Sequence, residues 1–154
     1  MTKQQWKNGD IFTIKLKDNT FVIGQVIAYE PQALNSVICA FYDIRNMHLE
    51  NIIRLDLKKN KIFSILFVTR DLLDSGRWNV ITTKNISMPF SWYFKLFKLR
   101  KNKMVGVKII GSGIVESFIN SFYSLEYWNN YKDPYYLDGL LISKSKKPKE
   151  VLYK

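Results

Sequence analysis

Few side chains in this sequence have the type and spacing that catalysis or metal binding requires. One cysteine and one histidine exclude an internal disulfide and a histidine-rich metal site. Cys39 lies in an apolar run typical of a buried thiol, and His48 has no second histidine or cysteine nearby. No spacing typical of acid and base partners is found among Asp10, Glu30, Asp43, Glu50 and Asp56. With no Gly-rich phosphate loop or nucleophile elbow either, the sequence predicts no catalytic centre and no cofactor.

One basic and aromatic segment, residues 89–103, has the composition of a binding surface. It interleaves Trp92, Tyr93, Phe94 and Phe97 with Lys95, Lys98, Arg100, Lys101 and Lys103. Such rings stack on bases and such lysines contact phosphates in single-strand binding proteins. The alternative is a hairpin with its rings inward, whose lysines keep a solvated edge from pairing with other chains. In both cases the segment favours an acidic partner over a basic one.

Positive charge is unevenly distributed along the chain. The formal net charge is +11, and residues 75–115 hold eight bases without a single acid. A second basic group lies around Pro148 in residues 144–154. No apolar run approaches the roughly 20 residues of a membrane span, and the first ten residues lack the apolar region of a secretory signal. These patterns predict a cytoplasmic protein with no membrane partner.

The elements that position these residues begin with a β-hairpin over residues 8–29. Apolar residues alternate through residues 11–16, and the alternation resumes after residues 18–19. A two-residue turn there predicts a definite register. Its facing pairs are Leu16 with Phe21, Ile14 with Ile23 and Phe12 with Gln25. Gly24 indicates a bulge or bend of the kind that curls a sheet towards a barrel.

Further strands follow along the chain. Residues 36–45 and 62–69 are apolar at both alternating positions, which predicts strands buried on both faces. We expect a short strand near residues 52–57, a helical turn at residues 71–76 that ends at Gly76, and a strand at residues 78–82. Residues 91–110 favour a second hairpin with its tip at 101–103, although the spacing of its lysines by three also fits one side of a helix.

The clearest helical pattern lies near the C-terminus, at residues 114–125. Its apolar stripe is Val115, Phe118, Ile119 and Phe122, and this stripe should pack on the sheet. The overall expectation is an α+β fold that is mainly β, with a strongly bent, partly open antiparallel sheet and this helix packed on it. We expect one domain over residues 1–143 and a loosely ordered basic tail over residues 144–154.

The order of several short segments resembles the immunity protein 26 family of bacterial polymorphic toxin systems. The residues that carry the resemblance are Gly9 to Phe12, Gly24 to Val26, Cys39 to Asp43, Phe67 to Thr69 and Ser75 to Ile81, with a weaker echo at Tyr135 to Asp138. The resemblance implies a mainly β protein that binds and neutralises a toxin and has no catalytic residues. The sequence departs from the family in its charge and after Ile81. Either the toxin partner presents an acidic surface, or the contact uses the apolar and acidic parts of residues 1–74 and 116–143, and the resemblance does not choose between these.

The residues expected to bind a partner are Arg77, Trp78, Lys95, Lys98, Arg100, Lys101 and Lys103. Arg beside Trp is a common interface pair, although Trp78 fits a core position better. Two other functions stay open. A nucleic-acid-binding module would use residues 91–110 and the tail. An endoribonuclease of the PemK-like kind begins similarly at residues 9–12, although the Arg-Pro segment of those toxins is missing here.

Overall fold

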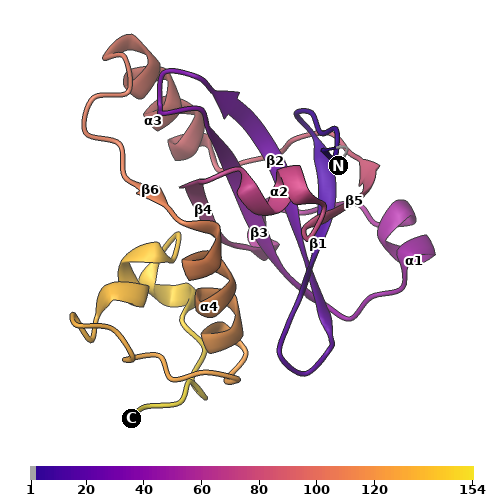
Figure 1. Cartoon of the computed structure of the whole chain (residues 1–154), viewed down its shortest axis with the longest axis vertical. Helices are drawn as coiled ribbons and strands as arrows, with labels where there is room; N and C mark the ends of the chain where they lie inside the picture. The colour runs from indigo at the N-terminus through magenta and orange to yellow at the C-terminus, as the bar shows by residue number, and fades with distance from the viewer. Residues whose placement is uncertain (1–2) are drawn as a thin grey trace.

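The computed structural model describes residues 3–154 and contains a six-stranded sheet. In the order β5-β1-β2-β3-β4-β6, its strands are β5 (Asn79–Thr83), β1 (Asp10–Lys15), β2 (Phe21–Glu30), β3 (Ser36–Arg45), β4 (Ile62–Val68) and β6 (Ile109–Ile110). All neighbours are antiparallel except β4 and β6. The sheet is twisted and open (Figure 1). This confirms the expected α+β class with a mostly antiparallel sheet.

Helices cover both faces of the sheet. The helices are α1 (Leu49–Arg54), α2 (Asp71–Ser75), α3 (Phe90–Lys101) and α4 (Ser112–Phe122), and the 3-10 turns are η1 (Lys59–Lys61), η2 (Tyr136–Leu140) and η3 (Lys144–Lys146). One apolar core joins the sheet to α2, α4 and the C-terminal segment, and the other joins it to α1 and α3. Because β3 contributes to both cores, its predicted burial on two faces is confirmed.

The helix α4 packs its predicted stripe on the sheet. Val115, Phe118 and Ile119 are fully buried, and the Phe122 ring stacks on Phe63 of β4 with centroids 4.0 Å apart. Burying each of these side chains stabilises the fold by about 1.5–3 kcal/mol relative to exposure. The expected C-terminal helix is therefore confirmed.

The register of the first hairpin differs from the expected one by one residue. The β1–β2 pairs include Ile14 with Val22 and Phe12 with Gly24. The Leu16 N–H donates to the Thr20 carbonyl, which leaves a three-residue loop with Asn19 at φ 67°. A three-residue loop ending in a left-handed residue is a common hairpin connection, and Asn tolerates that conformation. The two-residue turn was therefore wrong, and Phe21 is 43% exposed.

Two other expected strand segments are helical. Residues 49–54 form α1 in place of a strand near residues 52–57, and α3 replaces the first strand of the hairpin expected at residues 91–110. Only Ile109 and Ile110 of that segment pair with the sheet. The helical alternative given by the lysine spacing is therefore the correct one. Among residues 3–154, each helix is too short or too polar to cross a membrane.

The last eleven residues are packed on the body of the protein. Val151 is buried, and Leu152 forms an isolated bridge with Tyr127 and accepts a hydrogen bond from the Trp128 N–H at 2.7 Å. Lys147 pairs with Asp138 at 3.0 Å. The expectation of a loosely ordered tail was wrong because these contacts join the tail to residues 127–138, a pairing that the composition of the tail does not indicate.

Candidate protein-binding surface

Helix α3 carries two apolar stripes on different sides. Trp92 and Leu96 are buried in the core beneath the helix, and Leu99 packs beside them. The Trp92 ring meets Phe67 of β4 with centroids 6.4 Å apart. The spacing of these three residues by four and three follows the helical period, so this stripe fixes α3 on the sheet.

The second stripe of α3 faces solvent. Phe90, Tyr93, Phe94 and Phe97 are 81%, 45%, 53% and 64% exposed. Their positions i, i+3, i+4 and i+7 place them on one side of the helix. We call these four residues the aromatic stripe. Large contiguous apolar surface is rare on a soluble monomer and marks sites of interaction.

Lysines of α3 lie beside both stripes of the helix. The Lys98 ammonium lies 4.8 Å from the centre of the Phe94 ring, and that of Lys95 lies 4.5 Å from the centre of the Trp92 ring. Lys101 follows Phe97 by one helical turn, and Lys103 lies in the next turn with φ 55°. Together with Arg100, five of the seven predicted site residues therefore lie on α3 or at its C-terminal end.

Arg100 has a structural role on the same helix. Its guanidinium donates to one carboxylate oxygen of Glu30, from Nε at 2.9 Å and from Nη2 at 2.5 Å. Glu30 is buried at the end of β2, so the ion pair ties the last turn of α3 to the β2–β3 connection. Because a buried carboxylate without its cation is costly, Arg100 stabilises the fold.

Arg77 and Trp78 lie away from α3. Trp78 is completely buried and stacks on Phe12 with centroids 5.2 Å apart, so the core position favoured by the sequence is the observed one. Its indole N–H and the Arg77 guanidinium both donate to the Glu116 carboxylate of α4. This carboxylate raises the pKa of Arg77 through a hydrogen bond and its charge. Trp78 therefore presents no surface to a partner.

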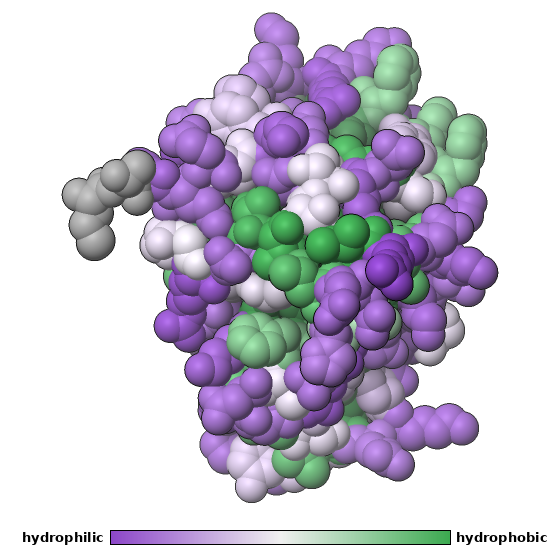
Figure 2. Space-filling view, turned by 90° about the vertical axis from the view of Figure 1, so that its right-hand side faces the viewer, coloured by the Kyte–Doolittle hydropathy of each residue, from purple (hydrophilic) through white to green (hydrophobic). Residues whose placement is uncertain are grey.

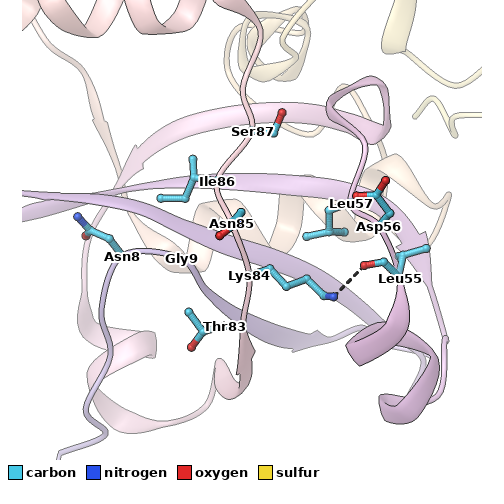
Figure 3. A pocket seen from close by; sticks show the side chains of 10 residues that line it. All are labelled: Asn8, Gly9, Leu55, Asp56, Leu57, Thr83, Lys84, Asn85, Ile86 and Ser87. Carbon is cyan, nitrogen blue, oxygen red and sulfur yellow. Dashed lines mark hydrogen bonds between the residues drawn. The ribbon is translucent and has the colours of Figure 1, made fainter.

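A hollow of about 720 Å³ opens between the start of β1, the end of α1 and the segment after β5 (Figure 3). Lys84 reaches across it and donates to the Ile53 and Leu55 carbonyls, both at 2.8 Å. Beneath it, the buried Gln25 amide donates to the Gly9 and Lys84 carbonyls. These polar groups hold backbone segments together, which gives them structural roles.

A smaller apolar area lies on the side of the molecule that carries α1 and β5. Figure 2 shows green, apolar side chains there, enclosed by purple, polar ones. Helix α1 contributes Leu49 and Ile53, each about half exposed. Since α1 has six residues and only these two exposed large apolar side chains, it offers less apolar surface than α3.

Burial keeps the Cys39 thiol and the Tyr42 hydroxyl protonated. Burial raises the pKa of the Cys39 thiol far above its usual range, so the thiol stays protonated. Burial also raises the pKa of Tyr42 to about 12, and its hydroxyl donates to Gln25. Among residues 3–154, no three His, Cys, Asp or Glu side chains come together as metal ligands.

Sequence reasoning found the composition of α3 but missed the orientation of its rings. The signal was the spacing of Phe90, Tyr93, Phe94 and Phe97 by three and four, alongside the separate spacing of Trp92, Leu96 and Leu99. Two apolar stripes on one helix leave no single hydrophobic side. Which stripe meets the sheet is decided by the tertiary structure.

The fold and this surface define an α+β protein whose open sheet carries a helix with aromatic and basic residues facing solvent. The family model of immunity protein 26 matches residues 7–104, which is more than half of the chain. The chain belongs to this immunity protein family. No curated protein and no solved structure matches it.

The match extends further than the sequence resemblance, which weakened after Ile81. It runs from the residues before β1 through the whole of α3 and ends before β6 and α4. The aromatic stripe is therefore part of the matched region. The weaker sequence similarity at residues 135–138 lies outside the matched region.

Proposed function

We propose that this protein neutralises a cognate toxin domain by binding it through α3, without catalysing a reaction. The observation that carries the proposal is the exposure of all four rings of the aromatic stripe on a helix already fixed to the sheet by its other side. Aromatic residues are enriched among the side chains that dominate binding energy at protein interfaces. The membership in an immunity protein family supports a toxin as the partner.

The lysines indicate the chemistry of the toxin surface. Lys98 and Lys101 lie beside the stripe and Lys103 follows it in the next turn, and no residue between 75 and 115 is acidic. A fitting partner has an apolar groove bordered by carboxylates, into which the helix places its rings. A second copy of this chain fits less well, because a symmetric contact would oppose these lysines to each other. Neutralisation would take place in the cytoplasm of the cell that holds the immunity protein.

The test pairs the protein with its cognate toxin domain. F94S/F97S removes two rings, and K98E/K101E reverses two charges, while Arg100 is left unchanged to keep its pair with Glu30. A central aromatic side chain is worth about 2 kcal/mol or more. We therefore expect each double variant to bind the toxin at least about 100-fold more weakly by calorimetry and to lose protection of cells.

The matched control is L49S/I53S on α1, which removes two exposed apolar side chains from another helix. It should bind and protect like the native protein. Circular dichroism and thermal melts should show that all three variants fold. Full protection by F94S/F97S and K98E/K101E would remove α3 from the toxin site, and RNA cleavage by the purified native protein would contradict a role by binding alone.

A further inference from the structure

Two entirely polar, basic turns that lie far apart in the sequence are adjacent in the fold. One is Lys58-Lys59-Asn60-Lys61 with η1, and the other is Ser143-Lys144-Ser145-Lys146-Lys147 with η3. The Lys146 ammonium donates to the Asn60 carbonyl and links the two turns directly. We call Lys58, Lys59, Lys61, Lys144 and Lys146 the lysine cluster.

The sheet edge fixes this arrangement. The Ile142 N–H donates to the Phe63 carbonyl at 2.9 Å, and the Ser64 hydroxyl donates to the Leu140 carbonyl. Residues 140–142 therefore run beside the start of β4, and the turns before Ile62 and after Ile142 emerge together. The cluster is thus set by buried hydrogen bonds and not by the mobility of long side chains.

The charges of the cluster are not compensated within it. None of the ion pairs formed among residues 3–154 includes a member of the lysine cluster. Lys58, Lys59, Lys61 and Lys144 are exposed. The nearest acid along the chain is Asp56 for the first turn, and Asp138 and Glu150 for Lys144. Asp138 pairs with Lys147 and accepts a hydrogen bond from the Trp128 indole, and the charge of Lys144 acts on it more weakly. Bringing these ammonium groups together costs Coulomb energy, which an anion would recover.

From this surface we infer a second binding site, which takes the phosphate backbone of a nucleic acid. Lysines bind phosphates as point charges, and five of them on a fixed edge match a repeating polyanion. A protein partner fits less well because protein interfaces are depleted in lysine and need an apolar centre, and neither turn contains an apolar residue. For the same reason nothing in the turns could insert into a lipid surface.

This site is separate from the aromatic stripe. Residues 139–142, just before the second turn, line one hollow with Trp92, Lys95 and Leu99 on the buried side of α3, and none of the four rings of the aromatic stripe lines it. The site also differs from the one expected from the sequence, which combined residues 91–110 with the tail. In the fold the tail lysines join residues 58–61 instead. Toxin binding and nucleic acid binding can therefore fail independently.

The test uses a fluorescein-labelled, 20-nucleotide single-stranded RNA of mixed sequence and fluorescence polarisation from 25 to 200 mM KCl. The variant K59Q/K61Q/K144Q removes three charges from the cluster. Its control K3Q/K15Q/K132Q removes three exposed charges elsewhere, so that the net charge falls equally. We expect at least a tenfold loss of affinity at 50 mM KCl for the cluster variant and less than a twofold loss for the control.

The salt dependence provides a second readout. Each lost phosphate contact should reduce the slope of log affinity against log salt by about 0.7 on a single strand, so the cluster variant should lose about 2 in slope. The inference is overturned if the native protein does not bind the RNA at 50 mM KCl, or if both triple variants lose affinity equally. It is also overturned if the cluster is required for binding to phosphatidylserine vesicles and not for binding to the RNA.

Discussion

At the scale of single residues, Asp71 joins the start of α2 to the start of α4. One of its carboxylate oxygens accepts hydrogen bonds from the Thr69 and Ser112 hydroxyls, both at 2.7 Å. The bond from Thr69 is the larger cause and that from Ser112 a further cause of a lowered Asp71 pKa, against the opposing effect of burial. The folded protein therefore binds this proton less readily than the unfolded chain.

The lowered pKa predicts how stability depends on pH. The contribution of Asp71 is present above its unfolded value of 3.8 and is lost as the pH falls through the lower folded value. D71N keeps an acceptor oxygen but removes the charge. At pH 7 it should lose about 1 kcal/mol, or about 2–4 °C in Tm.

Thermal melts from pH 7 to pH 2 check this prediction. The gap in Tm between D71N and the native protein should close towards the acid end. E150Q, which removes an exposed carboxylate from the C-terminal segment, should not produce this closing gap. A gap that stays constant down to pH 2 would show that the Asp71 charge does not stabilise the fold.

At the scale of elements, the first hairpin shows how a glycine allows a core to form. Gly24 faces Phe12 across β1 and β2, and a Cβ at Gly24 would lie 2.5 Å from the Phe12 ring. The ring stacks on Trp78 and meets Phe41 edge on, with centroids 6.3 Å apart. The Phe12 ring therefore occupies the space that a side chain at position 24 would need, and the β1–β2 register places Gly24 directly beneath that ring.

Replacing this glycine should strain the core. G24A is expected to reduce the free energy of unfolding by about 1–3 kcal/mol, because the enclosed Phe12 ring has nowhere to move. The control is G113A, at an exposed position of α4 where a Cβ meets nothing within 4 Å. It should be neutral or stabilising by up to about 1 kcal/mol. Urea unfolding measures both, and a G24A variant as stable as the native protein would contradict the close packing.

At the scale of the whole molecule, the C-terminal segment closes the core beneath α4. Trp128 is buried against Phe118. Its backbone N–H donates a hydrogen bond to the Leu152 carbonyl near the end of the chain. Ser124 of the preceding turn donates to the Glu150 carbonyl at 2.6 Å. The last residues therefore contribute to stability, while their lysines remain at the surface.

Truncation tests this contribution. Deletion of residues 150–154 removes the buried Val151 side chain and the acceptor for the Trp128 N–H. We expect a loss of about 2–4 kcal/mol in the free energy of unfolding, from apolar burial and one hydrogen bond. K149A/E150A changes only exposed side chains and should stay within about 0.5 kcal/mol of the native protein. If the truncated chain were as stable as the native protein, the last five residues would not contribute to the stability of the fold.

Much of the fold could be predicted from local patterns. Continuous apolar runs in residues 36–45 and 62–69 predicted β3 and β4, because a strand covered on both faces is apolar at every position. The period of Val115, Phe118 and Phe122 predicted α4, because burial of one side of a helix imposes that period. The hairpin register failed because loop length depends on the conformation of Asn19. The sequence predicted the residue types of the candidate site. The burial of Trp78 against Phe12 in the fold then removed that residue from the site.

The sequence by itself determined the α+β class, the strands buried on two faces and the resemblance to an immunity family, since these depend on residue type and short periods. Only the tertiary structure decided that one stripe of α3 is buried and the aromatic stripe exposed, and that Lys59 and Lys144 belong to one surface. The physical reason is that surfaces are made by contacts between distant segments. Local periodicity shows that a side chain can be buried, whereas long-range packing decides which ones are left for a partner.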